Sequence, residues 1–236
     1  TFTEFDNATD AIKHFDLNYI GLDMNVERGG NNQKKFILKP KGSNYSSFEL
    51  RHASSGIQTT APLIAMMNYY AQAFDFKLAQ KRSIIDLLFE KNLTTQYRPE
   101  MELTDMPKYV HIHIEEPELS LDPTSQIQML NEIIRLAFYS KVDSREIGLV
   151  LATHSPYIIN SLNLLMKAHD CKTDIDGAHV GYDDLSVYQI LSGGVADLKV
   201  KNIHYVNTDR LSEDINNIYD KYQELKQLQN EESLGK

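Results

Sequence analysis

The chain has 236 residues, of which 42% are hydrophobic, so it can bury the core of one large domain or of one and a half small ones. Its formal net charge of -9 excludes a surface that is basic throughout, and any contact with nucleic acid therefore depends on a local patch or on a partner. The single cysteine, Cys171, excludes an intramolecular disulfide framework and fits a reducing cytoplasm, and no apolar run approaches the roughly 20 residues that a membrane helix needs.

The first part of the chain has the pattern of an antiparallel β layer. Apolar residues alternate with polar residues and glycine over 20–26, which predicts a half-buried strand that ends in a turn at 29–32. Further strands are expected near 35–39 and 47–51.

A helix is predicted directly after the Ser-Ser-Gly sequence at 54–56, because residues 57–76 have the apolar spacing of a helix. Serine hydroxyls next to the free backbone N–H groups of a helix start can form an anion site. The plain alternative is that the serines only cap the helix. Residues 77–106 then form a helical insert, with a second helix up to residue 93 and a loop at 94–100.

Two β-rich runs that end in polar residues carry the strongest functional signal. The first is Val-His-Ile-His-Ile-Glu-Glu-Pro-Glu at 110–118, and the second is Leu-Val-Leu-Ala-Thr-His-Ser-Pro at 149–156. Strands of a parallel sheet deliver polar side chains to a ligand at their carboxyl ends. Glu115 and Glu116 are therefore expected beside a binding crevice, one directed to a hydrated Mg²⁺ and the other to an attacking water.

The segment between these two strands is predicted to be a helix from Pro123 to Tyr139. The expected buried side chains are Ile127, Leu130, Ile134 and Phe138. A linker at 141–146 then leads to the second strand, and strand, helix, strand is the α/β pattern.

The last part of the chain carries fewer motifs. A hairpin is predicted around Ser192-Gly-Gly, and Ser212 is expected to cap a helix. One face of this helix carries Ile215, Ile218, Tyr219, Tyr222 and Leu225. The predicted organisation is a first domain over 1–165, with residues 166–236 completing it or contacting partners.

Taken in this order, the motifs resemble ATPases of the ATP-binding-cassette type, and most closely the OLD-like and SMC-like ATPases of prokaryotes, many of which belong to antiphage defence modules. Residues 54–56 look like the signature motif, 112–116 like the Walker B strand, 118–123 like the D-loop and 153–155 like the switch-histidine loop. The resemblance implies an α/β P-loop NTPase fold, with a central, mostly parallel sheet besides the antiparallel β layer and the helical insert.

The resemblance also implies roles for these residues. Glu116 would be the general base, Glu115 would hold the Mg²⁺ shell and His154 would contact the γ-phosphate of ATP. Ser55 and Gly56 would clamp the nucleotide of a second subunit in a head-to-tail dimer or higher oligomer.

The same resemblance assigns Ser54 and Gln58 to the nucleotide-binding signature segment and Asp122 to communication between subunits. The phosphate-binding sequence Gly-x-x-x-x-Gly-Lys-Ser/Thr is absent from the 236 residues. We therefore expect the chain to be the carboxyl-terminal part of a longer ATPase.

The expected function is ATP hydrolysis that controls a separate nuclease or toxin effector in the cytoplasm, with contact to nucleic acid as a further option and no membrane association. An SMC-like DNA repair ATPase and a non-hydrolysing scaffold of cassette fold are the alternatives. Two features have plainer interpretations than function. His111, His113 and Glu115 imitate a metal triad, but polar packing is the preferred interpretation, and the lysines near 34–41 and 199–201 are expected to solvate a surface.

Overall fold

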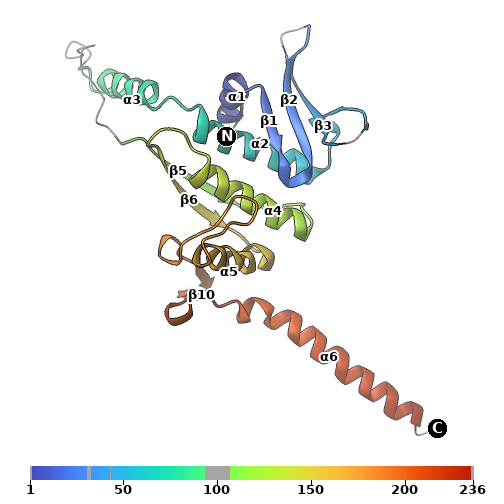
Figure 1. The fold of residues 1–236 in the computed structure, drawn as a ribbon. Coiled ribbons are helices and arrows are strands. Elements are labelled where there is room, and N and C mark those ends of the chain that lie inside the picture. The colour runs from blue at the N-terminus through green and yellow to red at the C-terminus, as the bar shows by residue number, and fades with distance from the viewer. Residues whose placement is uncertain (1, 31–32, 43, 94–106, 235–236) are drawn as a thin grey trace. The chain divides into compact units, whose positions relative to one another are not determined.

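The protein is described by a computed structural model over residues 2–30, 33–42, 44–93 and 107–234 (Figure 1). It divides into two compact units, the first formed by residues 1–153 with 176–178 and the second by 154–175 with 179–236. Both helices and strands are abundant, and the chain is of mixed α/β class. The predicted loop at 94–100 lies outside the described residues.

The first unit contains four α-helices and six strands within the described residues. The helices are α1 (Phe2–Ala11), α2 (Ser55–Gln72), α3 (Phe76–Glu90) and α4 (Pro123–Ile134). The strands are β1 (His14–Leu17), β2 (Leu22–Arg28), β3 (Lys34–Pro40), β4 (Phe48–Glu49), β5 (Tyr109–Glu115) and β6 (Glu146–Ala152).

The predicted antiparallel layer is confirmed as a four-stranded sheet in the order β1-β2-β3-β4. In β2 the apolar side chains of Leu22 and Met24 are buried and Asp23 and Asn25 are partly exposed, as the alternation predicts. Ile20 lies instead in a short 3-10 turn, which ends at Gly21 with a left-handed φ of 64°. Helix α1 and strand β1 precede this turn and were not among the predicted elements.

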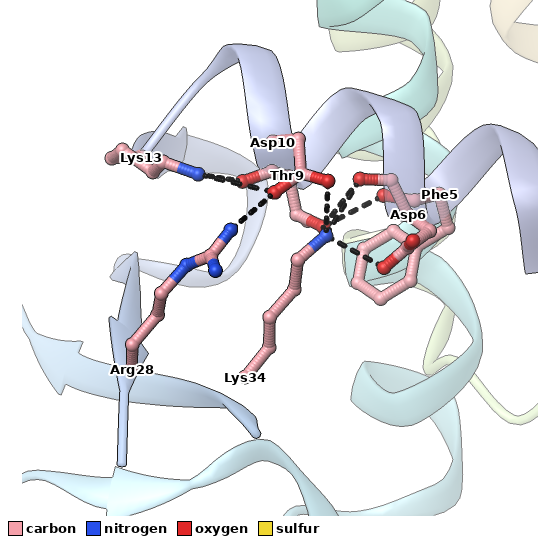
Figure 2. Close-up of polar contacts among 7 residues, drawn as sticks. All are labelled: Phe5, Asp6, Thr9, Asp10, Lys13, Arg28 and Lys34. Carbon is pink, nitrogen blue, oxygen red and sulfur yellow. Dashed lines mark hydrogen bonds and ion pairs between the residues drawn. The ribbon is translucent and has the colours of Figure 1, made fainter. Parts of the chain in front are cut away.

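Helix α1 is joined to the sheet by a network of charged side chains (Figure 2). The Nζ atom of Lys34, on β3, lies 2.6 Å from Asp6 Oδ1 and 3.1 Å from Asp10 Oδ2, and Arg28 Nη2 lies 3.0 Å from Asp10 Oδ1. The hydrogen bond from Lys34 lowers the pKa of Asp10 below its usual value. Only 14% of the Lys34 side chain is exposed, so this lysine serves the packing of α1 on the sheet.

The helix predicted over 57–76 is confirmed as α2, although α2 begins two residues earlier and ends four residues earlier than predicted. Helix α2 ends at Gln72, and α3 begins at Phe76 because the Asp75 carboxylate accepts a hydrogen bond from Leu78 N and caps a new helix. The expected insert helix is confirmed as α3.

Strands β5 and β6 pair in parallel, with Tyr109 opposite Glu146 and Glu115 opposite Ala152. The expected parallel arrangement of the two motif-bearing strands is therefore confirmed. Among the described residues the parallel sheet consists of these two strands, and the other sheets are antiparallel.

Helix α4 follows β5 as predicted, and it continues into a π-helical turn over Arg135–Tyr139. Leu130 and Ile134 are buried, but the prediction that Phe138 is buried is wrong. Because a π turn inserts one extra residue relative to an α-helix, the inward positions pass to Leu136 and Ala137, and Phe138 is 38% exposed.

The second unit consists of α5 (Pro156–Asp170), β7 (Tyr188–Leu191), β8 (Gly194–Asp197), β9 (Lys199–Val200), β10 (Tyr205–Val206) and α6 (Asp209–Leu234). The hairpin predicted around Ser192 is confirmed as β7 and β8. Helix α5 belongs to this unit because the side-chain amide of Asn163 forms two hydrogen bonds with β10. It donates to Val206 O at 3.0 Å and accepts from Val206 N at 2.7 Å. The chain passes from the first unit to the second between Thr153 and His154, and residues 176–178 join the first unit.

Helix α6 begins before the expected cap at Ser212, because the Asn207 side chain accepts from Asp209 N at 2.9 Å. The predicted apolar stripe lies on this helix and is exposed to solvent at Ile218, Tyr219, Tyr222 and Leu225. The side chain of Ile215 lies outside the described residues. No helix in the described ranges is both long enough and apolar enough to cross a membrane.

Candidate functional site

The carboxyl ends of β5 and β6 bring two of the predicted motifs to one edge of the parallel pair. Glu115 lies opposite Ala152 in the ladder, and Glu116 N donates to Ala152 O at 2.8 Å. Glu116 and Thr153 are therefore the first residues beyond the paired strand ends. This is where an open α/β sheet places ligand-binding groups.

Glu116 adopts an unusual backbone conformation, with a φ of 47°. Few residues other than glycine occupy this left-handed region, and those that do often lie at functional sites. The chain turns here, since Leu119 N donates to Glu116 O at 3.1 Å. The turn separates the two carboxylates, so that Glu115 is exposed at the strand end and Glu116 is half-buried.

The turn after β5 is tied to the end of β6 by a side-chain hydrogen bond. Thr153 Oγ1 donates to Glu118 Oε1 at 2.7 Å. This contact was not predicted, although both residues lie in motifs that the sequence had singled out. It links the segment that resembles a D-loop to the segment that resembles the switch loop.

Asp122 has a clear structural role at the start of α4. Its carboxylate accepts from Thr124 N at 3.0 Å and from Ser125 N at 3.2 Å. The hydroxyl of Ser125 also donates to it, and this hydrogen bond is the main reason why the pKa of Asp122 is lowered. Asp122 is therefore a helix cap here, and its expected role between subunits stays a prediction.

The predicted signature segment forms the start of helix α2. Ser54 is the N-cap residue by position, but its side chain makes no capping hydrogen bond, and both Ser54 and Ser55 are exposed. Gln58 instead closes the preceding loop, since its Nε2 atom donates to Arg51 O at 3.1 Å and to Ala53 O at 2.8 Å. Ser54 therefore occupies the N-cap position without a capping hydrogen bond, and Gln58 holds the loop that precedes the helix.

Gly56 connects this helix start to the turn after β5. A Cβ atom at Gly56 would lie 2.4 Å from the carbonyl oxygen of Ser120 and 2.9 Å from a methyl group of Leu121. Only a glycine permits so close an approach. The signature-like and D-loop-like segments, far apart in the sequence, are therefore in direct contact.

Two buried hydroxyls anchor the same helix start to the core. The hydroxyl oxygens of Tyr19 and Thr60 lie 2.6 Å apart, and Thr60 Oγ1 donates to Gly56 O at 2.8 Å. Burial raises the pKa of Tyr19 well above its usual value, so it remains a neutral hydroxyl. Neither residue was predicted, and the only sequence signal is that Thr60 lies one helical turn after Gly56.

His154 follows Thr153 at the end of β6 and is exposed. The next residue, Ser155, caps helix α5 by accepting from Tyr157 N at 3.2 Å and from Ile158 N at 3.3 Å. His154 thus occupies the junction between a strand end and a helix start. By its contacts it belongs to the second unit, whereas Glu116 belongs to the first.

His111 and His113 lie in a row of ring contacts on β5. The rings of Tyr109 and His111 have centroids 4.8 Å apart, those of His111 and His113 are 5.8 Å apart, and the Tyr109 hydroxyl is hydrogen-bonded to His111 Nε2. Gly148 on β6 leaves room for this row of rings. Within the described residues, no group of three or more histidine, cysteine, aspartate or glutamate side chains could hold a metal ion.

Four of the lysines considered for nucleic-acid contact, Lys34, Lys35, Lys41 and Lys199, are engaged in other interactions. Lys35 pairs with Glu49, Lys41 pairs with Asp16, and Lys34 belongs to the network of Figure 2. Lys199 donates to two backbone carbonyls, and its Nζ atom lies 4.0 Å from the centroid of the Tyr182 ring. The partly buried Lys34 and Lys199 contact neighbouring elements of the fold, whereas Lys35 forms a surface ion pair.

No protein-family model matches the chain, and no curated protein matches it either. The interpretation of the site therefore depends on its residues and their geometry.

Proposed function

We propose that the chain is part of an ATPase of cassette type, in which ATP binding and hydrolysis by a head-to-tail dimer or higher oligomer regulate an associated effector. The observation that carries the proposal is the meeting of three sequence motifs around the carboxyl end of β5. Gly56 approaches Ser120, and Glu118 accepts from Thr153. A nucleotide switch needs such contacts, because events at the phosphate must reach the subunit interface.

Glu116 is the proposed general base. It would orient the attacking water, and its place directly beyond the end of β5, where its N–H bonds to Ala152 O, supports this role. Glu115 offers an exposed carboxylate beside it, which suits the Mg²⁺ shell because Mg²⁺ prefers oxygen ligands and retains several waters. When bound, Mg²⁺ neutralises charge on the phosphates of ATP.

The remaining roles concern the phosphates. Ser55 and Gly56 begin a helix of 18 residues, whose free N–H groups favour an anion. We assign to them, with Ser54, the γ-phosphate of ATP held by a second subunit, and to His154 a contact with the γ-phosphate. Catalysis in this scheme comes from positioning and charge neutralisation, as is usual for phosphoryl transfer.

The proposed setting is an antiphage defence complex in the cytoplasm, with a separate nuclease or toxin as the effector. This part of the proposal follows from the resemblance in the motifs alone. An SMC-like DNA repair ATPase is favoured less, because Lys34, Lys35 and Lys41 are paired within the chain. A non-hydrolysing scaffold is the second candidate, since the side chains of Gln58 and Asp122 serve local structure.

The test is Glu116→Gln in the full-length protein, with ATP turnover and ATP binding measured on the same samples. The substitution keeps the size of the side chain and removes the base, so hydrolysis should fall by about 10²–10⁴-fold while ATP binding persists. Glu90→Gln is the matched control, because Glu90 is an exposed residue on α3, and its turnover should equal that of the wild type. Near-normal turnover in Glu116→Gln contradicts the assignment, and absence of any ATP turnover in the wild type favours the scaffold.

A further inference from the structure

The turn that follows β5 contains two left-handed residues that are not glycine. Glu116 has a φ of 47° and Ser120 has a φ of 60°. This conformation costs free energy in a residue with a Cβ atom, and it persists where surrounding contacts hold it. Within the turn, Leu119 N donates to Glu116 O at 3.1 Å and Leu121 N donates to Glu118 O at 3.0 Å. These bonds are local, so contacts with neighbouring segments have to fix the turn in place.

Each part of the turn is fixed by a different neighbour. Its start is held by the hydrogen bond from Glu116 N to Ala152 O, and its end lies against Gly56. Its middle is held by Glu118, whose Oε1 atom accepts from Thr153 Oγ1 at 2.7 Å. Glu118 is half-buried, and its Oε2 atom is shielded from solvent. A hydroxyl that donates to a carboxylate forms a stronger hydrogen bond than two neutral groups do.

The hydrogen bond at Glu118 bears directly on Glu116. One residue, Pro117, separates them, and the proline ring fixes the φ angle at this position. A displacement of Glu118 is therefore passed along the backbone to Glu116 with little to absorb it. The donor, Thr153, is the first residue after β6, and β6 pairs with β5 along its whole length. The direction of the Glu116 carboxylate thus depends on a contact with the neighbouring strand.

We propose that Glu118 is a positioning residue, which through its hydrogen bond with Thr153 holds the turn at 116–121 so that the Glu116 carboxylate stays aimed at the attacking water. The inference rests on the proposed ATPase function and deepens it, and it gives Glu118 no contact with the nucleotide. A displacement of about 1 Å at a reacting group can cost as much as 10²-fold in rate. Loss of the hydrogen bond should therefore slow hydrolysis and leave ATP binding intact.

The first test is Thr153→Val in the full-length protein, because valine keeps the shape of threonine and removes the donor. The kcat for ATP hydrolysis should fall by about tenfold or more, and KM should stay within about threefold of the wild type. Thr153→Ser keeps a hydroxyl and should keep kcat within about threefold. Thr3→Val is the matched control, because Thr3 is exposed on α1, and its kinetics should equal those of the wild type.

Two further variants separate positioning from direct catalysis. Glu118→Gln retains an oxygen that can accept from Thr153, so it should lose far less turnover than Glu116→Gln. In the Glu116→Gln background, Thr153→Val should change kcat by less than about twofold, because the group that it positions is already gone. Two residues with independent roles would instead multiply their effects.

Hydrogen exchange followed by mass spectrometry tests the turn itself, with no nucleotide present. The amides of 116–121 should exchange about tenfold faster in Thr153→Val than in the wild type and at the wild-type rate in Thr153→Ser. The amides of β2 and β3 should exchange equally in all three proteins.

Several results would overturn the proposal. Unchanged exchange at 116–121 in Thr153→Val would show that the hydrogen bond does not hold the turn. Normal kcat in the same variant, with turnover in the wild type, would refute the role of Glu118 alone. A loss in Glu118→Gln as large as that in Glu116→Gln would make Glu118 itself catalytic. A wild type without ATP turnover would refute the proposed function, and the role of Glu118 with it.

Discussion

Replacing Gly56 by alanine tests whether the start of α2 is held against the turn after β5. The added methyl group would lie 2.4 Å from the carbonyl oxygen of Ser120, 2.9 Å from Leu121 Cδ2 and 3.0 Å from the carbonyl carbon of Ser120. Two of these three atoms belong to the backbone, so a change of side-chain rotamer cannot relieve the clash. Either the helix start or the turn has to move.

The size of the effect follows from two opposing contributions. Alanine favours a helix over glycine by up to about 1 kcal/mol. Overpacking a filled site typically costs about 1–3 kcal/mol, and contact with backbone atoms belongs at the upper end of that range. The net expectation is that Gly56→Ala lowers the free energy of unfolding by about 2 kcal/mol, or the melting temperature by roughly 4–8 °C.

The assay is equilibrium unfolding in urea, with thermal melts alongside. Gly30→Ala is the matched control, because a Cβ atom at Gly30 would meet nothing within 4 Å, and its stability should remain within about 0.5 kcal/mol of the wild type. If Gly56→Ala is as stable as the wild type or more stable, the close approach of α2 to Ser120 is refuted. The observation that carries the proposed function would then be lost as well.

Two further predictions concern stability. Tyr19→Phe removes a buried hydroxyl but leaves Thr60 bonded to Gly56 O, so the free energy of unfolding should fall by only about 1 kcal/mol. Thr60→Val leaves the Tyr19 hydroxyl without its acceptor, so the free energy of unfolding should fall by about 2 kcal/mol. Urea unfolding of both variants measures these changes, and the reverse order would refute the hydrogen-bond assignment. The hydrogen bond from Ser125 lowers the pKa of Asp122 in the folded protein, so its contribution to stability is present above the unfolded pKa of about 3.9 and is lost as the pH falls through the folded value. Asp122→Asn keeps a cap without the charge and should show a weaker loss of stability between about pH 5 and pH 2 in melts across that range, and an unchanged pH profile would contradict the assignment.

Several elements could be predicted from the sequence because their signals are local. The alternation in β2 and the helical spacing in α4 each depend on residues only a few positions apart. The same holds for the glutamate pair at the end of β5, since a β-rich run followed by polar residues predicts a strand end wherever the strand lies. Boundaries were less certain because a single side chain, such as the Asp75 carboxylate that caps α3, can fix where a helix begins.

The tertiary structure decided what depends on atoms from distant parts of the chain. The contact of Gly56 with Ser120, the hydrogen bond from Thr153 to Glu118 and the pairing of Lys34 with α1 each join segments far apart in the sequence. The exposure of Phe138 depends on a π turn, which the regular helical spacing of the sequence does not reveal. The sequence by itself determined which residues belong to the motifs behind the proposed function, because residue type and spacing are local properties. Only the tertiary structure decided which of them meet, because proximity depends on the packing of the whole unit.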